Sequence, residues 1–587
     1  MSTPAPARNQ TSTGRRIAIA SVALGILIAA ATTAGLALPD GGSRPAAVCA
    51  AGGIVAGLAG FICVYGFLSA LAGDRGGIGG LAARIPRPPA SPEVRHPAAF
   101  CLAAFAVLII CWAPILLAAY PGFFDYDVGH EWNSQSIQYE TGVLNAHHPV
   151  LHTLFLGGTM QLGRALTGSY NGGVAVSVAL QAVIVAAVLA AVLRVLIALG
   201  TRRRGAVAVI AYWALDPVIG MYAFATTKDV LFSAFTVAFC AIVYRMCGQA
   251  AGTRGAGAER QHRAPIAALA TLAVLAFLIV SLRSNALYAL AVACPIIVLL
   301  ARRGARLALA GSLGAGIAAA LIWLGPVAAA MGVQESPVGT WNALCVPMQQ
   351  LAYAAQSDEV SLADRDEINR AVPDLEYNPQ LSDAARYPFM HAPTGMGELA
   401  RLYLRMGARY PVQYAKAYLL LTQDAWNPFA VIDAHMADAG TTEVIEYDPK
   451  EPATRATKLP ALDRALRWIA TERGVERVPV LGLGVSIPFY ILALLVALAR
   501  CWVTRDRSGA AALTPMLWLV ATNLLGPCMI IRYFLYLFHG LPLIARVLFA
   551  GQGDESEVER DEEVERRCVA RPVVDGRRHE QGAHQRR

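Results

Sequence analysis

The chain has 587 residues, of which 56% are hydrophobic and only 15% are charged, and its mean hydropathy is +0.46. Soluble proteins carry about a quarter charged residues, so this composition excludes an ordinary soluble protein and predicts helices that cross a bilayer. The alternating segments of about ten residues that a β-barrel requires are absent. The net charge of +8 comes mostly from arginines in short loops and at the termini, which excludes nucleic-acid binding as its explanation.

The N-terminal apolar run lies in "GRRIAIASVALGILIAAATTAGLAL", residues 14–38. It is longer than the 7–15 apolar residues of a signal peptide, and no clear cleavage site follows it. An uncleaved helix is therefore the favoured interpretation, and a signal peptide is the alternative.

Twelve apolar segments of suitable length for a membrane span follow one another along the chain. We place them at 17–38, 46–72, 98–119, 172–200, 205–224, 229–247, 264–282, 286–301, 307–331, 481–501, 510–530 and 533–550. With this count every arginine cluster, such as "TRRRG" and "ARRGAR", falls on one side of the membrane. The positive-inside rule then predicts a multi-pass protein of the plasma membrane with both termini in the cytoplasm.

The fold class predicted from this pattern is an all-α polytopic membrane protein with a mainly helical extracytoplasmic domain. The expected organisation is a cytoplasmic N-terminus with two additional transmembrane helices (1–97), a transmembrane core (98–331) that contains the outside loop 120–171, an extracytoplasmic domain (332–480), C-terminal transmembrane helices (481–550) and a disordered cytoplasmic tail (551–587). Within the predicted domain, residues 397–423 place apolar side chains at helical spacing, interrupted at Pro411.

The loop between the third and fourth expected spans is unusually rich in titratable residues: "YPGFFDYDVGHEWNSQSIQYETGVLNAHHPVLH", 120–152. Asp125 and Asp127 follow directly where a helix leaves the membrane. Partial desolvation there raises the pKa of a carboxylate and makes it a better general base, unless a cation pairs with it. Asp127 is the favoured candidate and Asp125 the second, with an ordinary acidic loop as the alternative.

The end of this loop, "HHP", precedes a short apolar stretch at 150–166. His148 takes an N-cap-like position, Pro149 is the first helical residue, and His148 and His152 share one helix face. Such a pair can bind a metal, so a divalent metal is a possible cofactor, although hydrogen bonding at the membrane interface explains the histidines equally well. The stretch 150–166 is short and broken by glycines, which favours a helix lying on or dipping into the membrane.

Cations on the predicted outer face are a sharper signal, because orientation rules deplete them there. Lys228 lies in "ATTKDVLFS", Arg283 in the very short connection "SLRSN", and Arg532 in the apolar "MIIRYFLYLFHG". Ionisable residues at such depth are candidate functional groups, and the start of a helix at "TTKD" favours a phosphate. The alternatives are a local pair, for example Lys228 with Asp229, or snorkelling to lipid headgroups. Asp229 is also explained as a capping charge.

Four motifs together, "YPGFFDYD…NAHHP", "TTKDVLFS", "VPMQQLA" (346–352) and "RYFLYLFHGLPLI", resemble an uncharacterised family of bacterial membrane proteins placed near the GT-C glycosyltransferases. That superfamily includes the protein O-mannosyltransferases and the aminoarabinose transferases. The resemblance covers most of 98–550 and implies a GT-C-like helical bundle. It also implies transfer of a sugar from a polyprenyl-phosphate donor with inversion at the anomeric carbon.

The resemblance further implies roles for individual residues. Asp127, or Asp125, would deprotonate the acceptor hydroxyl. The other residues would bind the substrates: Lys228, Arg283 and Arg532 the lipid phosphate, with Asp229 and Tyr533 beside them, His147 and His148 the phosphate or acceptor, and Gln349 and Gln350 the sugar. Trp426 is a weaker sugar-contact candidate, and interfacial anchoring explains it better. The acceptor (protein, glycan or lipid) stays open.

Two other functions are compatible with the sequence. One is a transporter or flippase of an anionic lipid or solute, which would favour charges at mid-depth, broken helices and internal repeats. The other is a non-catalytic envelope-assembly protein, which would tolerate alanine at Asp125 and Asp127.

Overall fold

The computed structural model describes residues 8–38, 45–72, 91–124, 144–248, 266–336, 341–428, 453–470, 478 and 481–550. Within these ranges every regular element is a helix, and β structure is limited to two isolated bridges. Eight helices in the described part are long and apolar enough to cross a membrane. The prediction of an all-α, multi-pass membrane protein is confirmed, while the count of twelve spans stays a prediction.

The helices of the membrane part are α1 (Arg8–Ala37), α2 (Ala46–Leu71), α4 (Pro97–Ala119), α7 (Val150–Thr167), α8 (Tyr170–Ala198), α9 (Arg203–Leu215), α10 (Pro217–Tyr222), α11 (Lys228–Gly248), α12 (Ile266–Leu282), α13 (Ser284–Leu300), α14 (Arg303–Ile322), α15 (Ala328–Ala330), α24 (Ile487–Thr504), α25 (Arg507–Asn523) and α26 (Ile531–Leu548). A π-turn, Trp323–Val327, joins α14 to α15 around Pro326. Of these helices α12 and α13 are apolar but shorter than 18 residues, and α7 is not among the eight candidate spans.

The segment expected as one span at 205–224 is broken into α9 and α10. Pro217 has no N–H to donate and forces the preceding residue out of the helical region, and Asp216 is extended with φ −65° and ψ 117°. The Asp216 carboxylate accepts a hydrogen bond from the N–H of Ile219 at 3.1 Å. The break therefore begins a new, capped helix rather than a gentle kink.

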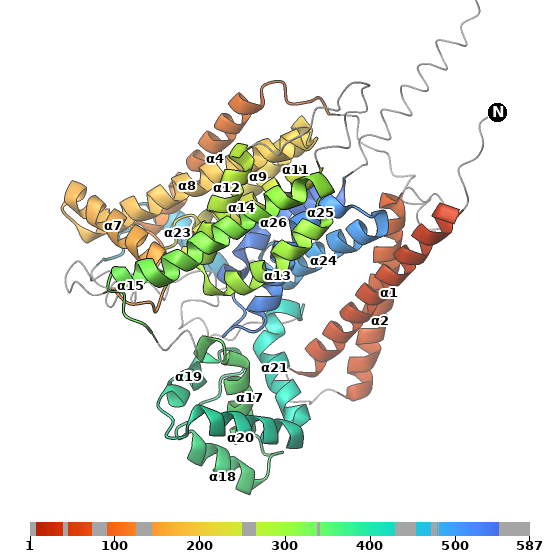
Figure 1. The fold of residues 1–587 in the computed structure, drawn as a ribbon, viewed down its shortest axis with the longest axis vertical. Helices are drawn as coiled ribbons and strands as arrows, with labels where there is room; N and C mark the ends of the chain where they lie inside the picture. The colour runs from red at the N-terminus through yellow and green to blue at the C-terminus, as the bar shows by residue number, and fades with distance from the viewer. Residues whose placement is uncertain are drawn as a thin grey trace, which may run out of the picture.

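The centre of the membrane part is α11, whose apolar window is 78% buried. It packs against α8, α12, α25 and α26 within one continuous cluster of buried apolar side chains (Figure 1). Two indole N–H groups that this packing buries find backbone acceptors: Trp112 donates to Trp213 O at 3.1 Å, and Trp213 donates to His539 O at 3.0 Å. These bonds tie α4, α9 and α26 together, since a buried indole N–H needs a partner.

The two additional N-terminal helices form a pair beside α24 (Figure 1). Glycines let their backbones approach closely: a Cβ built on Gly57 would lie 2.9 Å from Gly25 O. On the other side Ile17, Leu24 and Leu68 pack with Val503 of α24 in a small cluster of their own.

A second helical unit, residues 341–428, lies against one end of the membrane part (Figure 1). It consists of α17 (Cys345–Gln356), α18 (Leu362–Ala371), α19 (Asp383–Met390), α20 (Met396–Arg409) and α21 (Pro411–Trp426) around its own apolar core. We call it the helical domain, and the helix break falls at Tyr410–Pro411, as Pro411 predicts. The Ser382 N–H donates to Pro527 O at 2.9 Å, which joins this domain to the loop before α26.

The rest of the described part of 332–480 is packed against the membrane helices. Helix α23 (Pro460–Ala470) contacts α4. In the irregular segment before it, Lys458 N–H donates to Leu117 O at 2.8 Å and Ala456 N–H donates to Tyr120 O at 3.0 Å. The predicted extracytoplasmic region thus contains one domain and one segment that covers the end of α4.

Candidate functional site

The stem of the acidic loop is fastened to the turn that precedes α11. Phe123 forms an isolated parallel bridge with Ala225, in which Phe123 N–H donates to Phe224 O and Thr226 N–H donates to Phe123 O, both at 3.0 Å. Buried Gln181 of α8 donates to Ala225 O at 2.7 Å and holds the same turn. Asp125 and Asp127 follow this stem in the sequence and themselves lie outside the described residues.

Helix α11 begins at Lys228, and its first turn carries a buried ion pair. Asp229 is fully buried, and its Oδ1 lies 2.8 Å from Nη1 of Arg283, whose side chain is 11% exposed. The Thr227 hydroxyl donates to the other carboxylate oxygen at 3.3 Å. Arg283 occupies a one-residue connection between α12 and α13, where its backbone is extended with φ −147°. The ion pair therefore joins the start of α11 to the α12–α13 junction.

Two arginines contact the same aromatic ring at this end of the core. The guanidinium carbon of Arg283 lies 4.4 Å from the centre of the Tyr533 ring, and that of Arg532 lies 5.2 Å from it. Arg283 also lies 5.5 Å from the Phe232 ring of α11. Arg532 is buried, with 5% of its surface exposed. Cation–π contacts of this kind attract a guanidinium group to the ring face and so favour one orientation of the arginine side chain.

A chain of amides holds the ends of three helices around this pair. The Nδ2 of Asn523 donates to Tyr533 O at 2.7 Å, and the Nδ2 of Asn285 donates to Asn523 Oδ1 at 2.9 Å. Sequence analysis missed these two residues and Thr227. The sequence did contain a signal for the two asparagines, because each lies next to an apolar run. Polar side chains in membrane helices usually have a hydrogen-bond partner, so an asparagine at such a position is a candidate for an internal contact.

The structure thus brings together four of the predicted substrate-binding residues, Asp229, Arg283, Arg532 and Tyr533, and Lys228 directly precedes Asp229 at the start of α11. We call these five residues the cation cluster, because Arg283 pairs with Asp229 and shares the Tyr533 ring with Arg532. The N-terminus of α11 adds a positive dipole end. The cluster lies at the end of the core that faces the helical domain, because Tyr533 packs with Leu381, Cys528 and Ile530 there.

The predicted histidines lie at the start of α7. His148 is 9% exposed and its ring centre is 4.6 Å from that of His147, whose backbone N–H donates to Asn145 Oδ1 at 3.0 Å. His152 is 1% exposed and also turns into the protein. Among the described residues there is no group of three or more His, Cys, Asp or Glu side chains arranged to hold a metal ion.

The predicted glutamines point into the helical domain. Gln350 donates to Tyr414 O at 3.0 Å and accepts from the Tyr403 hydroxyl at 2.7 Å, so both halves of its amide are engaged. Gln349 is fully buried and donates to Asn378 O at 2.5 Å. A role in sugar binding would require these internal hydrogen bonds to be exchanged. Trp426 lies at the end of α21 and donates to Thr422 Oγ1 at 3.1 Å.

Cys345, at the start of α17, carries a buried thiol of low reactivity. Burial raises the pKa of its thiol to about 12. A thiol with this pKa stays protonated at neutral pH and is a poor nucleophile. Cys345 is therefore not a candidate nucleophile.

Comparison with known proteins places the chain in a family without naming an activity. No curated protein and no solved structure matches it. A family model matches residues 138–551, which include α7 to α26 and the helical domain but not α1, α2 or α4. Since this match covers well over half of the chain, the protein belongs to the family of unknown function DUF6020.

Proposed function

We propose that the protein is a membrane glycosyltransferase with a GT-C-like bundle, which transfers a sugar from a polyprenyl-phosphate donor to an acceptor on the extracytoplasmic face. The observation that carries the proposal is the cation cluster: at one end of the membrane core Arg283 pairs with Asp229 and shares the Tyr533 ring with Arg532, and Lys228 begins the helix that carries Asp229. A lipid phosphate reaches such a site from the bilayer while its isoprenoid tail stays among the helices.

The cluster supplies positive charge in a fixed geometry. Asp229 and the Tyr533 ring hold the Arg283 guanidinium, and the same ring contacts Arg532. Preorganised cations stabilise a leaving group on which negative charge develops, because they need no reorganisation during the reaction. Lys228, at the first position of α11, adds a further positive charge beside the helix N-terminus.

In the proposed reaction the acceptor hydroxyl oxygen attacks the anomeric carbon, and the bond from that carbon to the phosphate oxygen breaks. The phosphate keeps the electron pair and leaves as the lipid phosphate, while the acceptor proton passes to Asp127 or Asp125. The stem contact between Phe123 and Ala225 supports this assignment, since the acidic stretch begins in the sequence directly beyond a segment fastened to the turn before Lys228.

The test is sugar transfer from radiolabelled polyprenyl-phosphate sugars in membranes that contain wild type, Asp127→Ala or Asp125→Ala at matched expression. Asp366→Ala, an exposed carboxylate on α18, is the matched control. We expect transfer by wild type and the control, and its collapse in one loop variant. Absence of transfer from every donor, with both loop variants still complementing a deletion strain, would contradict the proposal and favour an assembly role.

One observation favours the transporter alternative. The break at Asp216–Pro217 lies about 20 Å along α9 from Arg203, at the 1.5 Å rise of a helix. Broken helices with polar groups near mid-depth are typical of secondary transporters. The Tyr212 and Tyr490 hydroxyls lie 3.2 Å apart close to this break. Uptake or flipping of a labelled anionic lipid by reconstituted protein, abolished by Asp216→Ala, would establish this alternative.

A further inference from the structure

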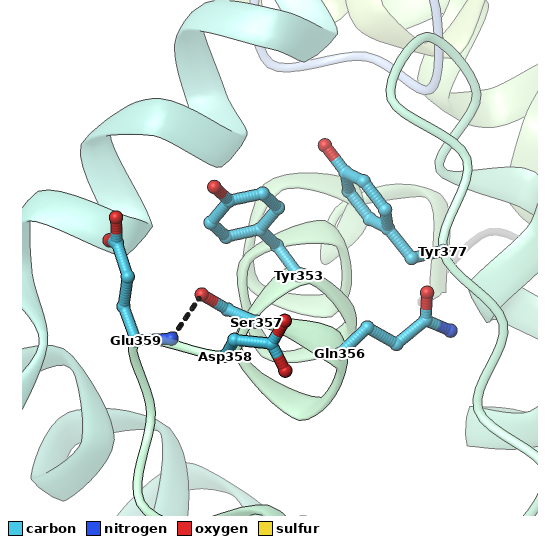
Figure 2. A pocket seen from close by; sticks show the side chains of 6 residues that line it. All are labelled: Tyr353, Gln356, Ser357, Asp358, Glu359 and Tyr377. Atoms are coloured by element: carbon cyan, nitrogen blue, oxygen red, sulfur yellow. Dashed lines mark hydrogen bonds between the residues drawn. The ribbon is translucent and has the colours of Figure 1, made fainter. Parts of the chain in front are cut away.

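A pocket of about 380 Å³ opens in the helical domain, and none of its lining residues belongs to the cation cluster (Figure 2). Ligand pockets usually enclose roughly 300–1,000 Å³. Its walls come from the last turn of α17, the turn that follows it and the loop before α19. The lining residues are Tyr353, Gln356, Ser357, Asp358, Glu359 and Tyr377.

Two tyrosines form an aromatic corner in this pocket. The ring centres of Tyr353 and Tyr377 lie 5.2 Å apart with an angle of 67° between the planes, so two ring surfaces at different angles border the pocket (Figure 2). The hydroxyl oxygen of Tyr377 is buried and has no hydrogen-bond partner among the residues that the structure describes. A buried hydroxyl without a partner costs stability. Because this oxygen is itself buried, a ligand in the pocket would contact the ring of Tyr377 rather than its hydroxyl.

The polar side chains beside the tyrosines are held in place by their neighbours. Gln356 donates through Nε2 to Leu375 O at 3.2 Å, which turns its amide carbonyl into a fixed acceptor. Ser357 Oγ accepts from the Glu359 N–H at 3.3 Å. Amide, carboxylate and hydroxyl groups next to an aromatic surface suit a ligand that carries several hydroxyls and a weakly polar ring face.

The charges of the pocket favour a neutral ligand over a cation. Both oxygens of Glu359 lie within 3.1 Å of Lys416 Nζ, and Asp358 Oδ1 lies 3.1 Å from Arg365 Nη1. Aromatic ring faces attract an ammonium group, and carboxylates that are not already matched by cations strengthen that attraction. Here each carboxylate has its own cation, so the pocket offers hydrogen-bonding oxygens without an excess of negative charge.

The place of the pocket in the domain bears on the size of the ligand. Helix α17 begins at Cys345, beside the loop that meets Pro527, and ends at Gln356 in the pocket. Its 12 residues span about 17 Å at the usual rise of a helix. Helix α21 runs back from Gln413 and Lys416, near Glu359, to α24 of the core. The pocket lies at the opposite end of α17 from the contact with the membrane part, so a glycan that binds in the pocket and also reaches the cation cluster would be longer than one sugar ring.

We propose that this pocket binds a neutral oligosaccharide, as the distal part of the acceptor that receives the sugar at the cation cluster. The inference rests on the proposed function in one respect, since a glycan bound here is an acceptor only if the protein is a glycosyltransferase. Glycan binding itself is argued only from the contacts of the pocket. The acceptor class it names is a glycan chain, rather than a protein or a simple lipid.

The test is binding of fluorescently labelled neutral oligosaccharides of two to eight sugar units to the full-length protein in detergent, with choline as the cationic probe. The first variant is Tyr353→Ala. The second is Gln356→Ala, whose position is exposed, so that the test still works if loss of the Tyr353 ring unfolds the domain. Tyr387→Ala is the matched control, since Tyr387 is 70% exposed, its ring contacts that of His391, and it is not among the residues that line the pocket. We expect saturable binding of the longer oligosaccharides, weakened roughly threefold to tenfold by loss of the Tyr353 ring and unchanged in the control.

The outcomes separate this inference from the proposed function. Oligosaccharide binding that depends on Tyr353 and Gln356, without any sugar transfer, keeps the glycan site and overturns the transferase. Transfer to a glycan that is unaffected by both variants, in KM and in binding, overturns the pocket and keeps the transferase. If choline binds to the protein and no oligosaccharide binds or competes with it, the inference of a neutral ligand is overturned.

Discussion

Nη1 of Arg283 and Oδ1 of Asp229 lie 2.8 Å apart. This ion pair joins the first turn of α11 to the residue that follows α12, so the rest of α11 and the whole of α12 lie between the two residues in the sequence. Its carboxylate is fully buried and its guanidinium nearly so. A buried pair of this kind adds little net stability over apolar residues of the same size, because both charges lose their hydration. Its effect is to hold one arginine in a defined position, next to a second arginine on the same tyrosine ring.

Removal of one partner of this pair is expected to be costly. Asp229→Ala leaves the Arg283 guanidinium buried without its carboxylate, and the expected loss is about 3–5 kcal/mol of unfolding free energy. The double variant Asp229→Leu with Arg283→Met should recover most of that loss, because neither charge remains buried. Thermal and denaturant unfolding in detergent measure both. Equal stability of the single and double variants would show that the pair carries no coupling.

Lys228 and Arg532, the two other cations of the cluster, are expected to act on the use of the donor. Arg532→Ala should also lower stability, because the Arg532 side chain is buried against the Tyr533 ring. Loss of a charge-assisted hydrogen bond is worth about 1.5–3 kcal/mol, so Lys228→Ala should weaken donor use by roughly tenfold to a hundredfold. Arg532→Ala should also lower kcat, because in the proposed reaction the Arg532 charge stabilises the negative charge that develops on the leaving phosphate in the transition state. Transfer kinetics with varied donor concentration check both. Arg401→Ala, with 77% of its side chain exposed on α20, is the control.

The helical domain is expected to lose stability in strong acid through Asp364. The Tyr410 hydroxyl, at 2.5 Å from its Oδ2, and the Ser361 hydroxyl, at 2.7 Å, lower the pKa of this carboxyl from 3.8 to about 2, with help from Arg409. Because the folded-state pKa lies below the unfolded one, the stabilisation is complete above about pH 4 and is lost as the pH falls toward 2.

Thermal unfolding of the full-length protein between pH 5 and 2 measures this dependence. Tyr410→Phe removes the strongest of the hydrogen bonds to Asp364, so its pKa should rise and the acid loss should shrink. The same acid dependence in wild type and Tyr410→Phe would contradict the assignment.

The close contact of α7 with α8 predicts that Gly163 does not tolerate a side chain. A Cβ at this position would lie 2.7 Å from Gly172 O and 2.8 Å from Gly173 Cα, both backbone atoms that cannot turn aside. Gly163→Val should therefore cost about 1–3 kcal/mol through overpacking. Gly168→Ala is a poor control because of its left-handed backbone, so Gly314→Ala, which meets nothing within 4 Å, serves instead.

Several features of this structure follow from local sequence alone. Long apolar runs form helices wherever the bilayer leaves the backbone no other partner for its hydrogen bonds. Pro411 separates α20 from α21, and the "TTKD" segment begins α11 at Lys228. The one-residue connection at Arg283 was also predictable, because two apolar runs there leave almost no room for a loop.

The partner of Asp229 was beyond local reasoning. Its neighbour Lys228 was the natural candidate from the sequence, yet Asp229 turns into the protein and pairs with Arg283. Which side of a helix faces the core depends on the helices that surround it, and α11 is surrounded on most sides. In the same way Gln349 and Gln350 were predicted to face a ligand, whereas their amides bond within the helical domain.

The sequence by itself determined the class of protein and the residues of interest, since hydrophobicity, helix breakers and charge positions act over a few residues at a time. Only the tertiary structure decided which of those residues meet. Asp229, Arg283 and Arg532 come from three distant segments, and the packing of α11 with α12 and α26 brings Arg283 to the Asp229 carboxylate and both arginines to the Tyr533 ring. The pocket between Tyr353 and Tyr377 arose in the same way, because a loop had to fold back on the end of α17 to form it.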